Sequence, residues 1–402
     1  MAHAARRNAH RHTSGATFRE IFAVGEFRAL WSAQASSVIG DQLARVALTL
    51  LVYDRSGSAL LAAVTFAASV VPIFIGGIFL AGLADRFPRR QVMIICDLAR
   101  LALVLAMIIP GLPIAGLVVL LFAVTMLGPP FTSARAGIYR DFLAGDRYVV
   151  GTAITLTTFQ LAQVVGFAVG GALVALVGTR TTLLADAATF AFSALVSRIW
   201  VGARPTAGGA KHGAGIAEGF RLAFGLPGLR TPMLFGWLAL FYNVPEGVAA
   251  PLARSIGASA ASVGLILAAS ALGAAVGGLA FTRLVGPDTR LKWMRPLAIA
   301  ACAALTLFVL RPALPFVLAI LFVSGVFDCF QVAASTAFVS TAPPEHRSQV
   351  FGIAQAGMSL GQGIAMVLAG AAALSHAPST VIVASGVLGA LVAAMIHVER
   401  DH

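Results

Sequence analysis

Long runs of residues without a single Lys, Arg, Asp or Glu divide this sequence and limit what it can fold into. Such runs cover residues 58–84, 101–134, 148–179 and 255–282. A helix needs about 20 apolar residues to cross the roughly 30 Å of hydrocarbon in a bilayer. Each run exceeds that length, so each predicts at least one membrane-spanning helix.

Apolar stretches of this kind recur along the whole chain, and we interpret them as twelve transmembrane helices. They lack the period-2 alternation of barrel strands and are far longer than the roughly 9–11 residues that such a strand needs. The predicted fold class is therefore an all-α membrane protein. The predicted spans are roughly residues 29–53, 58–84, 91–110, 114–138, 149–177, 181–203, 231–253, 257–282, 293–310, 314–341, 348–373 and 377–397.

Composition excludes the soluble classes of protein. Hydrophobic residues make up 59% of the 402 residues and charged ones only 11%, against about 25% charged in soluble domains. A soluble enzyme, a nucleic-acid module and a secreted disulfide scaffold are thereby excluded. The three cysteines, Cys96, Cys302 and Cys329, lie inside apolar runs and match no zinc pattern. No metal or other cofactor is expected.

Basic residues are concentrated in every second loop, and this sets the orientation. With the N-terminus inside, 21 of the 28 Lys and Arg residues fall on the inside, four fall outside and three lie within spans. The positive-inside rule therefore predicts a multi-pass protein of the cell membrane with both termini in the cytoplasm. The net charge of +12 is interpreted as this topology signal and as contact with anionic lipid, not as a nucleic-acid site.

The loops and an internal repeat divide the chain into two halves. Ala67-Ala68-Ser69 with Gly76-Gly77 recurs 201 residues later as Ala268-Ala269-Ser270 with Gly277-Gly278. Parallel repeats of this kind are typical of transporters, which place a site at the midplane between the halves. The longest polar break should hold a short surface helix near 215–223. The predicted units are a basic cytoplasmic tail (1–28), a six-helix bundle (29–203), a cytoplasmic linker (204–230), a second, pseudo-symmetric six-helix bundle (231–397) and a cytoplasmic C-terminus (398–402).

The most specific motif lies in the loop between the second and third predicted spans. It reads Gly82-Leu-Ala-Asp85-Arg86-Phe-Pro88-Arg89-Arg90 and resembles the Gly-x-x-x-Asp-Arg-x-Gly-Arg-Arg signature of the major facilitator superfamily. The glycine stands one residue closer to the aspartate than in the signature, and Pro88 replaces the second glycine. The resemblance implies that this motif is a cytoplasmic gate, in which the aspartate reaches the start of span eleven and is favoured by the helix dipole there.

Shorter motifs resemble the macrolide-efflux and enterobactin-exporter branch of that superfamily. These motifs are Phe27-Arg28-Ala-Leu-Trp31, Gly40-Asp41, Asp97-Leu-Ala-Arg100, Asp186-Ala-Ala-Thr-Phe190, Pro245-Glu246-Gly247, and His346-Arg347 through Gly352 to Gly361-Gln362-Gly363. The resemblance implies a monomeric secondary active transporter that exports a hydrophobic or amphipathic small molecule, such as a drug or secondary metabolite, by alternating access. The partners expected are this substrate, protons and the lipid bilayer.

Charged residues within the spans indicate where a proton could be carried. Such charges cost roughly 2.5–3.5 kcal/mol each unless they face water or a partner. The resemblance to the major facilitator superfamily implies that spans one, four, seven and ten line the central cavity, which would place Asp41, Glu246 and Asp328 there. A carboxyl group in a partly dry cavity can exchange protons near neutral pH. Arg45 is one turn from Asp41, so the alternative is a static Asp41–Arg45 pair, with Glu246 and Asp328 binding only substrate or water.

Other polar and small residues in the spans are interpreted structurally. Asp97 and Arg100 are expected to form a secondary charge network, which also includes Arg135 at the cytoplasmic end of span four. Asp186 is expected to be shallow on the outer side, near Arg180. Span five carries Gly166-Phe167 where antiporters of the superfamily have Gly-Pro, and its glycines Gly166, Gly170 and Gly171 predict close helix packing.

Alternative functions remain open at this point. Within transport, a siderophore exporter or a lysolipid flippase fits the same sequence. A transport-inactive membrane sensor or scaffold is the alternative of another class, but it would have no need for costly buried charges. An enzyme is not expected, because the chain contains no His-Glu-x-x-His motif, no intramembrane protease motif and no Walker loop.

Overall fold

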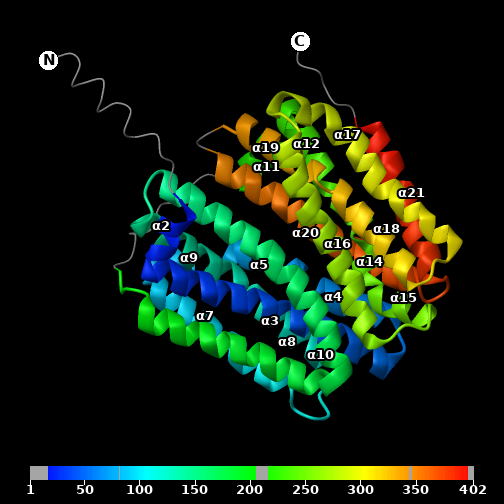
Figure 1. The fold of residues 1–402 in the computed structure, drawn as a ribbon, viewed down its shortest axis with the longest axis horizontal. Coiled ribbons are helices and arrows are strands. Elements are labelled where there is room, and N and C mark those ends of the chain that lie inside the picture. Colours follow the sequence, from blue (N-terminus) through cyan, green and yellow to red (C-terminus); the bar gives the residue numbers. More distant parts are fainter. Residues whose placement is uncertain (1–16, 81, 205–215, 344–345, 397–402) are drawn as a thin grey trace.

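The computed structural model describes residues 17–80, 82–204, 216–343 and 346–396. The regular elements in these ranges are all helices, and they form two groups, one from each half of the chain (Figure 1). Residues 1–16 of the predicted tail, residues 205–215 of the predicted linker and the whole predicted C-terminus lie outside the described residues. Large apolar side chains such as Leu176 and Leu284 are more than 80% exposed, as expected for helices that face lipid.

The N-terminal bundle contains two kinds of span, continuous and broken. The spans over Ala59–Phe79 and Ile114–Phe142 are interrupted near Pro72 and Pro129, because proline lacks the N–H that the helix ladder needs. The long α10 turns back at Gly178, whose φ of 80° favours glycine. The helices are α2 (Phe18–Ala23), α3 (Gly25–Ser56), α4 (Ala59–Ala67), α5 (Val71–Phe79), α6 (Leu83–Arg86), α7 (Arg89–Met107), α8 (Ile114–Met126), α9 (Gly128–Phe142) and α10 (Asp146–Trp200).

The C-terminal bundle begins with the short helix α11, which lies where the linker helix was predicted, and its first span is broken three times. The helices are α11 (Ile216–Gly225), α12 (Pro227–Trp237), α13 (Ala239–Tyr242), α14 (Val244–Gly247), α15 (Ala249–Ser255), α16 (Ala260–Leu284), α17 (Pro287–Ala304), the 3₁₀-helix η1 (Leu305–Leu310), α18 (Leu314–Phe327), α19 (Phe330–Thr341), α20 (Arg347–Ala372) and α21 (Pro378–Met395).

Nine helices within the described residues are long and apolar enough to cross a membrane. This number counts α10 once, although its two arms on either side of Gly178 each have the length of a span. It leaves out α7, which carries Asp97 and Arg100, and the broken run α12–α15. The structure is therefore all-α and fits the predicted twelve crossings.

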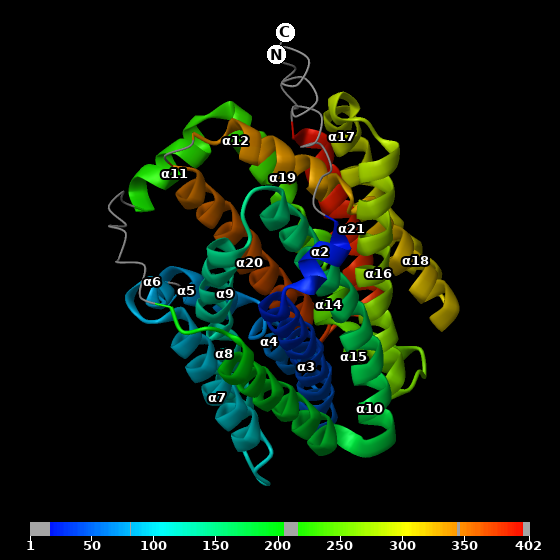
Figure 2. The same ribbon diagram turned by 60° about the vertical axis from the view of Figure 1, so that its left-hand side comes forward.

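The two bundles meet along two pairs of helices. The helix α10 runs beside α16, and α20 runs beside α4 (Figure 2). A Cβ atom added to Gly171 would lie 2.8 Å from the Cα of Gly264, so these two backbones touch directly. A Cβ atom on Gly370 would lie 2.4 Å from the Cβ of Ala63. Glycines thus allow the closest approach between the bundles.

Gly166 and Gly170 serve a different contact, within the N-terminal bundle. A Cβ atom on Gly166 would lie 2.8 Å from the Cβ of Gln42, and one on Gly170 would lie 3.2 Å from the Cα of Leu43. Both glycines therefore hold the first arm of α10 against α3. The three glycines predicted to pack helices closely thus face two different neighbours.

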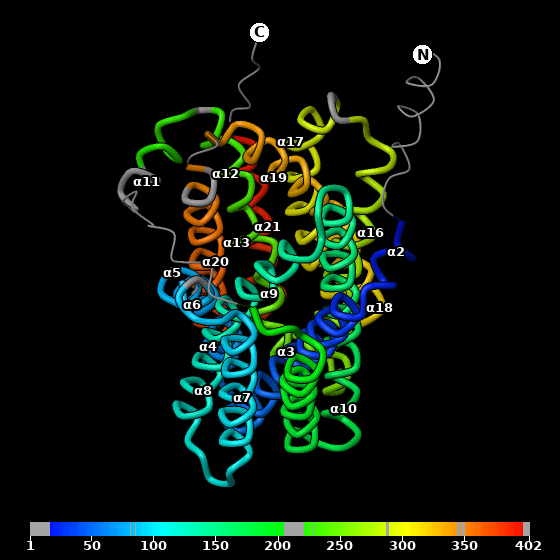
Figure 3. Tube along the Cα trace, turned by 90° about the vertical axis from the view of Figure 1, so that its left-hand side faces the viewer, coloured from blue at the N-terminus to red at the C-terminus, as the bar shows by residue number. Residues whose placement is uncertain are grey.

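The two ends of each bundle differ in what they carry. The end of the C-terminal bundle with α11 and α17 lies toward the top of Figure 3, and α6 lies at the upper end of α7 in the N-terminal bundle. The loop after α7 and the bend of α10 lie at the opposite end of the N-terminal bundle. Arg254 and Asp54 form an ion pair between the bundles at that opposite end. We call the first end the motif end and the second the paired end.

Candidate functional site

A cavity of about 890 Å³ lies mainly within the N-terminal bundle. Its walls are largely apolar, with aromatic rings from Phe74, Phe131 and Phe159. The charged side chains on its lining are Asp41, Arg45, Arg100, Arg135 and Asp186. The cavity is large enough for a drug-sized molecule, and it combines apolar surface with a few charged groups, as ligand sites do.

Asp41 forms its ion pair with Arg100 rather than with Arg45. The distance from its carboxylate to Nη2 of Arg100 is 3.9 Å, and the Asp41 side chain is 31% exposed. Arg100 is held in place because it donates to the carbonyl of Val124 (3.2 Å) and to Ser37 Oγ (3.4 Å). Its guanidinium also lies 4.9 Å from the ring centre of Phe190. The two residues come from α3 and α7, so the pair joins neighbouring spans.

Arg45, one turn after Asp41, reaches toward the second bundle. It donates to the carbonyl of Ser69 (3.2 Å) and lies over the ring of Phe66, 5.4 Å from its centre. It also interacts electrostatically with Glu246 of the other bundle. Arg45 is therefore placed between the acids of the two halves.

A second cavity, of about 430 Å³, lies within the C-terminal bundle and is lined by Glu246 and Asp328. Tyr242 donates to Asp328 Oδ1 across 2.5 Å. Gln331 in turn donates to the Tyr242 hydroxyl (2.7 Å) and to the carbonyl of Gly236 (3.0 Å). Asp328 lies at the break between α18 and α19. No Lys or Arg is among the described residues that line this cavity.

The two cavities adjoin, because Phe351 and Gln355 of α20 line both. The structure thus places Asp41 and Arg45 in one cavity and Glu246 and Asp328 in the next. The three acids predicted from sequence to line one central cavity, Asp41, Glu246 and Asp328, thus lie on two neighbouring cavities, and α10 and α20 line both of them. Arg135, predicted near the cytoplasmic end of span four, also lines the first cavity, where Phe131 and Tyr139 lie under its guanidinium.

Asp97 and Asp186 are both fully buried but have different surroundings. Asp97 accepts a hydrogen bond from Ser193 Oγ (2.6 Å). Within the described residues it forms no ion pair with Arg100, which pairs with Asp41 instead. Asp186 lines the first cavity beside Asp41 rather than lying shallow near Arg180. Sequence reasoning missed this position, although eight residues beyond the bend at Gly178 correspond to about 12 Å along the helix from that bend.

The gate motif makes contacts at the motif end of the N-terminal bundle. Arg89 binds both carboxylate oxygens of Asp141 at 3.0 Å, and Arg90 donates to the carbonyl of Arg198. Gly82 and Arg86 are exposed at either end of α6. The Asp85 backbone belongs to α6, but its side chain lies outside the described part of the structure. The predicted contact of Asp85 with span eleven therefore stays a prediction.

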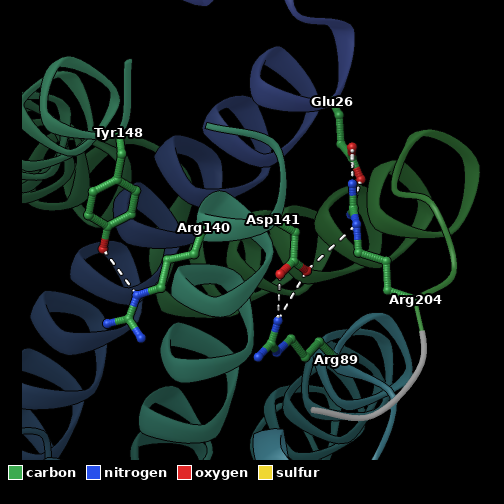
Figure 4. Close-up of polar contacts among 6 residues, drawn as sticks. All are labelled: Glu26, Arg89, Arg140, Asp141, Tyr148 and Arg204. Atoms are coloured by element: carbon green, nitrogen blue, oxygen red, sulfur yellow. Dashed lines mark hydrogen bonds and ion pairs between the residues drawn. The ribbon is translucent and has the colours of Figure 1, made fainter. Parts of the chain in front are cut away.

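Arg89 belongs to a larger ionic cluster that sequence reasoning did not identify (Figure 4). Arg204, just after α10, binds Glu26 through two nitrogens at 2.6 and 2.8 Å and approaches Asp141 to 3.6 Å. The hydrogen bonds that Arg204 donates to Glu26 raise the pKa of Arg204. The cluster ties together the ends of α3, α7, α9 and α10. The sequence feature that could have revealed this cluster is the presence of two acids, Glu26 and Asp141, at loop ends that otherwise hold basic residues.

Comparisons with known proteins fit this architecture. The family model of the Major Facilitator Superfamily matches residues 30–246 and 243–402. The chain is 27% identical over 355 residues to the multidrug efflux pump Tap of Mycolicibacterium fortuitum, covering 83% of this chain and 87% of that protein. It is also 27% identical over 338 residues to Tap of Mycobacterium tuberculosis, covering 78% and 79%.

Solved structures share the fold at low sequence identity. A POT family transporter in complex with 5-aminolevulinic acid gives a TM-score of 0.73 at 12% identity, covering 92% of this chain and 95% of that one. The nucleoside transporter NupG gives 0.70 at 13% identity, covering 93% and 98%. The family model covers nearly the whole chain, and the helices, the two bundles and the central cavities agree with it. The chain therefore belongs to the major facilitator superfamily.

Proposed function

We propose that this chain exports hydrophobic or amphipathic small molecules, drugs among them, in exchange for protons that enter the cell. The observation that carries the proposal is the placement of Asp41, Glu246 and Asp328 on two adjoining cavities, one in each bundle. The apolar walls can bind a hydrophobic substrate, and the acids can bind a proton. The relatives named multidrug efflux pumps support the substrate class.

The contacts between the bundles support a direction. The glycine contact of Gly171 with Gly264 and the Asp54–Arg254 ion pair hold the bundles together toward the paired end. The charge bias of the loops assigns the motif end to the cytoplasm. Substrate then enters from the cytoplasm, and separation of the paired end releases it outside. Protonation of the acids in that outward state favours the return.

The energy available from protons is sufficient for such work. Moving one charge through 100 mV supplies about 2.3 kcal/mol, and each 1.4 kcal/mol is worth a factor of ten in concentration. One proton per cycle therefore supports a gradient of roughly 50-fold from the membrane potential alone. No ATP-binding motif is needed.

Everted vesicles from cells that produce the full chain test this proposal. Their lumen is acidified, and ethidium, erythromycin and tetracycline are added one at a time. A substrate should accumulate inside and collapse part of the pH gradient, and nigericin should abolish the accumulation. Vesicles without the chain are the control. Movement of lysolipid without a gradient would identify a flippase, and no gradient-dependent uptake of any of the three compounds would contradict the proposal.

Single variants then identify the acids involved. Asp41→Asn, Glu246→Gln and Asp328→Asn each remove one cavity acid with little change of shape. Asp146→Asn, which alters an exposed acid at the start of α10, is the matched control. At least one cavity variant should lose coupled uptake by tenfold or more while the control keeps it. Full coupling in all three would show that these residues do not carry the proton.

A further inference from the structure

Asp186 is a buried acid that has no role in the proton antiport proposed above. Its side chain is 0% exposed, and neither carboxylate oxygen has a hydrogen-bond partner among the residues that the structure describes. The nearby Thr189 hydroxyl donates to the main-chain carbonyl of Asp186 (2.7 Å) and also lies close to the carboxyl group. Asp186 also borders the 890 Å³ cavity. A fully buried acid with so little hydrogen bonding is unusual.

The position of Asp186 is fixed by close packing against α3. A Cβ atom on Gly40 would lie 2.4 Å from Asp186 Oδ1 and 2.2 Å from Thr189 Oγ1. Glycine at position 40 therefore leaves the space that the carboxyl group occupies. The next residue in the chain is Asp41, so the two acids lie beside each other on neighbouring helices.

The charged groups around Asp186 come from two helices. Asp41 and Arg45 project from α3, and Asp97 and Arg100 from α7. Asp186 interacts electrostatically with Asp41 and Arg100. Arg45 also interacts with Asp41, but it donates to the Ser69 carbonyl and faces Glu246 of the other bundle, whereas Arg100 acts on all three acids. Arg100 is thus the cation that the three acids share.

The charges of this cluster do not balance if every acid is ionised. Asp41 has Arg100 at 3.9 Å and is partly exposed to the cavity. Asp97 has the Ser193 hydroxyl at 2.6 Å. Asp186 has no water-exposed surface and no ion pair among the described residues, and the hydroxyl nearest to it, that of Thr189, already donates to a main-chain carbonyl. A buried, unpaired carboxylate costs several kcal/mol, and the group avoids this cost by holding a proton.

We propose that Asp186 is a proton-binding residue of the transport cycle and that Arg100 controls its proton by moving between Asp41 and Asp186. In the conformation described, Arg100 lies by Asp41, and Asp186 carries the proton. When Arg100 turns to Asp186, the O–H bond of the carboxyl group breaks, the electron pair stays on Asp186, and the proton passes to cavity water. This inference rests on the proposed proton antiport and adds a residue to it.

The geometry links this step to substrate. Asp41 is the only member of the acid group that is both paired with Arg100 and partly open to the cavity among the residues described. A substrate that contacts Asp41 competes with Arg100 for it. The displaced guanidinium then has Asp186 as its next carboxyl group along the same wall. Substrate entry from the cytoplasmic side thereby releases a proton to that side, as antiport requires.

Infrared difference spectroscopy of the full chain in detergent tests the proton on Asp186 without any substrate. Spectra recorded across a pH series report the C=O stretch of protonated carboxyl groups. The wild-type protein should show such a band, and Asp186→Asn should lose one component of it. Asp146→Asn should leave the band unchanged. Because Asp186→Asn could fail to fold, Asp186→Glu is measured as well and should shift the same component.

Folding of each variant is checked by gel filtration and thermal unfolding. A band unchanged in a folded Asp186→Asn or Asp186→Glu protein overturns the inference. The vesicle assay separates this from failure of the proposed function. A wild-type chain with the Asp186 band but no proton-coupled uptake contradicts the proposed antiport alone. A coupled wild-type chain whose Asp186→Asn variant keeps both band and coupling contradicts this inference alone.

Discussion

Arg254, at the end of α15, forms an ion pair with Asp54, near the end of α3, and this pair joins the two bundles at the paired end. Both side chains are about half exposed, at 61% and 46%. An exposed pair of this kind contributes about 0–1 kcal/mol to stability. Its effect should therefore fall on the balance between closed and open states rather than on folding.

Asp54→Asn and Arg254→Gln should each leave thermal unfolding almost unchanged but open the paired end more often. Labelling of a cysteine placed between α3 and α15 should become several-fold faster, since 1 kcal/mol corresponds to about a fivefold change in population. The exchange variant Asp54→Arg with Arg254→Asp should restore the wild-type labelling rate. Equal rates in the wild-type and single-variant chains would show that the pair does not hold this end closed.

The contact between Gly171 and Gly264 predicts a different outcome, in which stability does change. A Cβ atom on Gly264 would lie 2.3 Å from the carbonyl oxygen of Phe167, so Gly264→Val should push α16 away from α10. Overpacking of this kind costs typically about 1–3 kcal/mol. The unfolding temperature in detergent should fall, and transport should be lost because the paired end no longer closes. Gly278→Ala on the same helix, whose nearest atom is at 3.9 Å, is the control and should behave as wild type.

The ionic cluster at the motif end predicts a stabilisation that does not vary with pH in the neutral range. Hydrogen bonds to Glu26 raise the pKa of Arg204, so its contribution is complete at any pH below the ordinary pKa of an arginine and is lost only when the pH rises through the raised pKa, far above the neutral range. Arg204→Gln should lower stability by about 1–2 kcal/mol, since bidentate pairs are strong but this one is a quarter exposed. The loss should be the same at pH 6 and pH 9 in thermal unfolding.

High salt should reduce that loss, because screening weakens partly exposed pairs. Arg140→Gln is the matched control, as Arg140 in the same region makes only a 3.5 Å contact with Tyr148. A loss in Arg204→Gln that disappears between pH 6 and pH 9 would mean that another group, not the charged guanidinium, supplies the stabilisation.

The fold could be predicted from sequence because a bilayer leaves few choices. Uncharged runs that are long enough to cross the bilayer predict where the helices lie in the sequence. Basic residues in every second loop predict which way each helix crosses. The rotation of each helix about its axis could not be predicted in the same way. The spans are apolar on all sides, so no stripe indicates which face meets a neighbour. From the sequence, Arg45 on the same helix is therefore the alternative ion-pair partner for Asp41, whereas in the structure Asp41 pairs with Arg100 of α7.

The position of a residue along its span was the second property that could not be predicted from the sequence. The sequence places Asp186 near Arg180, which predicts a shallow position, but Arg180 is beside the bend at Gly178 and Asp186 is about two turns further along α10. The ionic cluster of Glu26, Asp141 and Arg204 joins residues up to 178 positions apart. Its members look like ordinary loop charges until the bundle brings them together.

The hydroxyl of Tyr242 gives the last prediction, because it is the donor that Asp328 accepts from within the second cavity. Tyr242→Phe removes this hydrogen bond and leaves the ring packed edge-on against Phe330, with centres 6.0 Å apart. The fold should survive, but Asp328 loses its donor, and the pH profile of coupled uptake in everted vesicles should shift. Tyr139→Phe is the matched control, since Tyr139 is a buried tyrosine of α9 in the N-terminal bundle and is not among the described residues that line the second cavity. An identical shift in both variants, or none in Tyr242→Phe, would show that this hydrogen bond does not tune the acid.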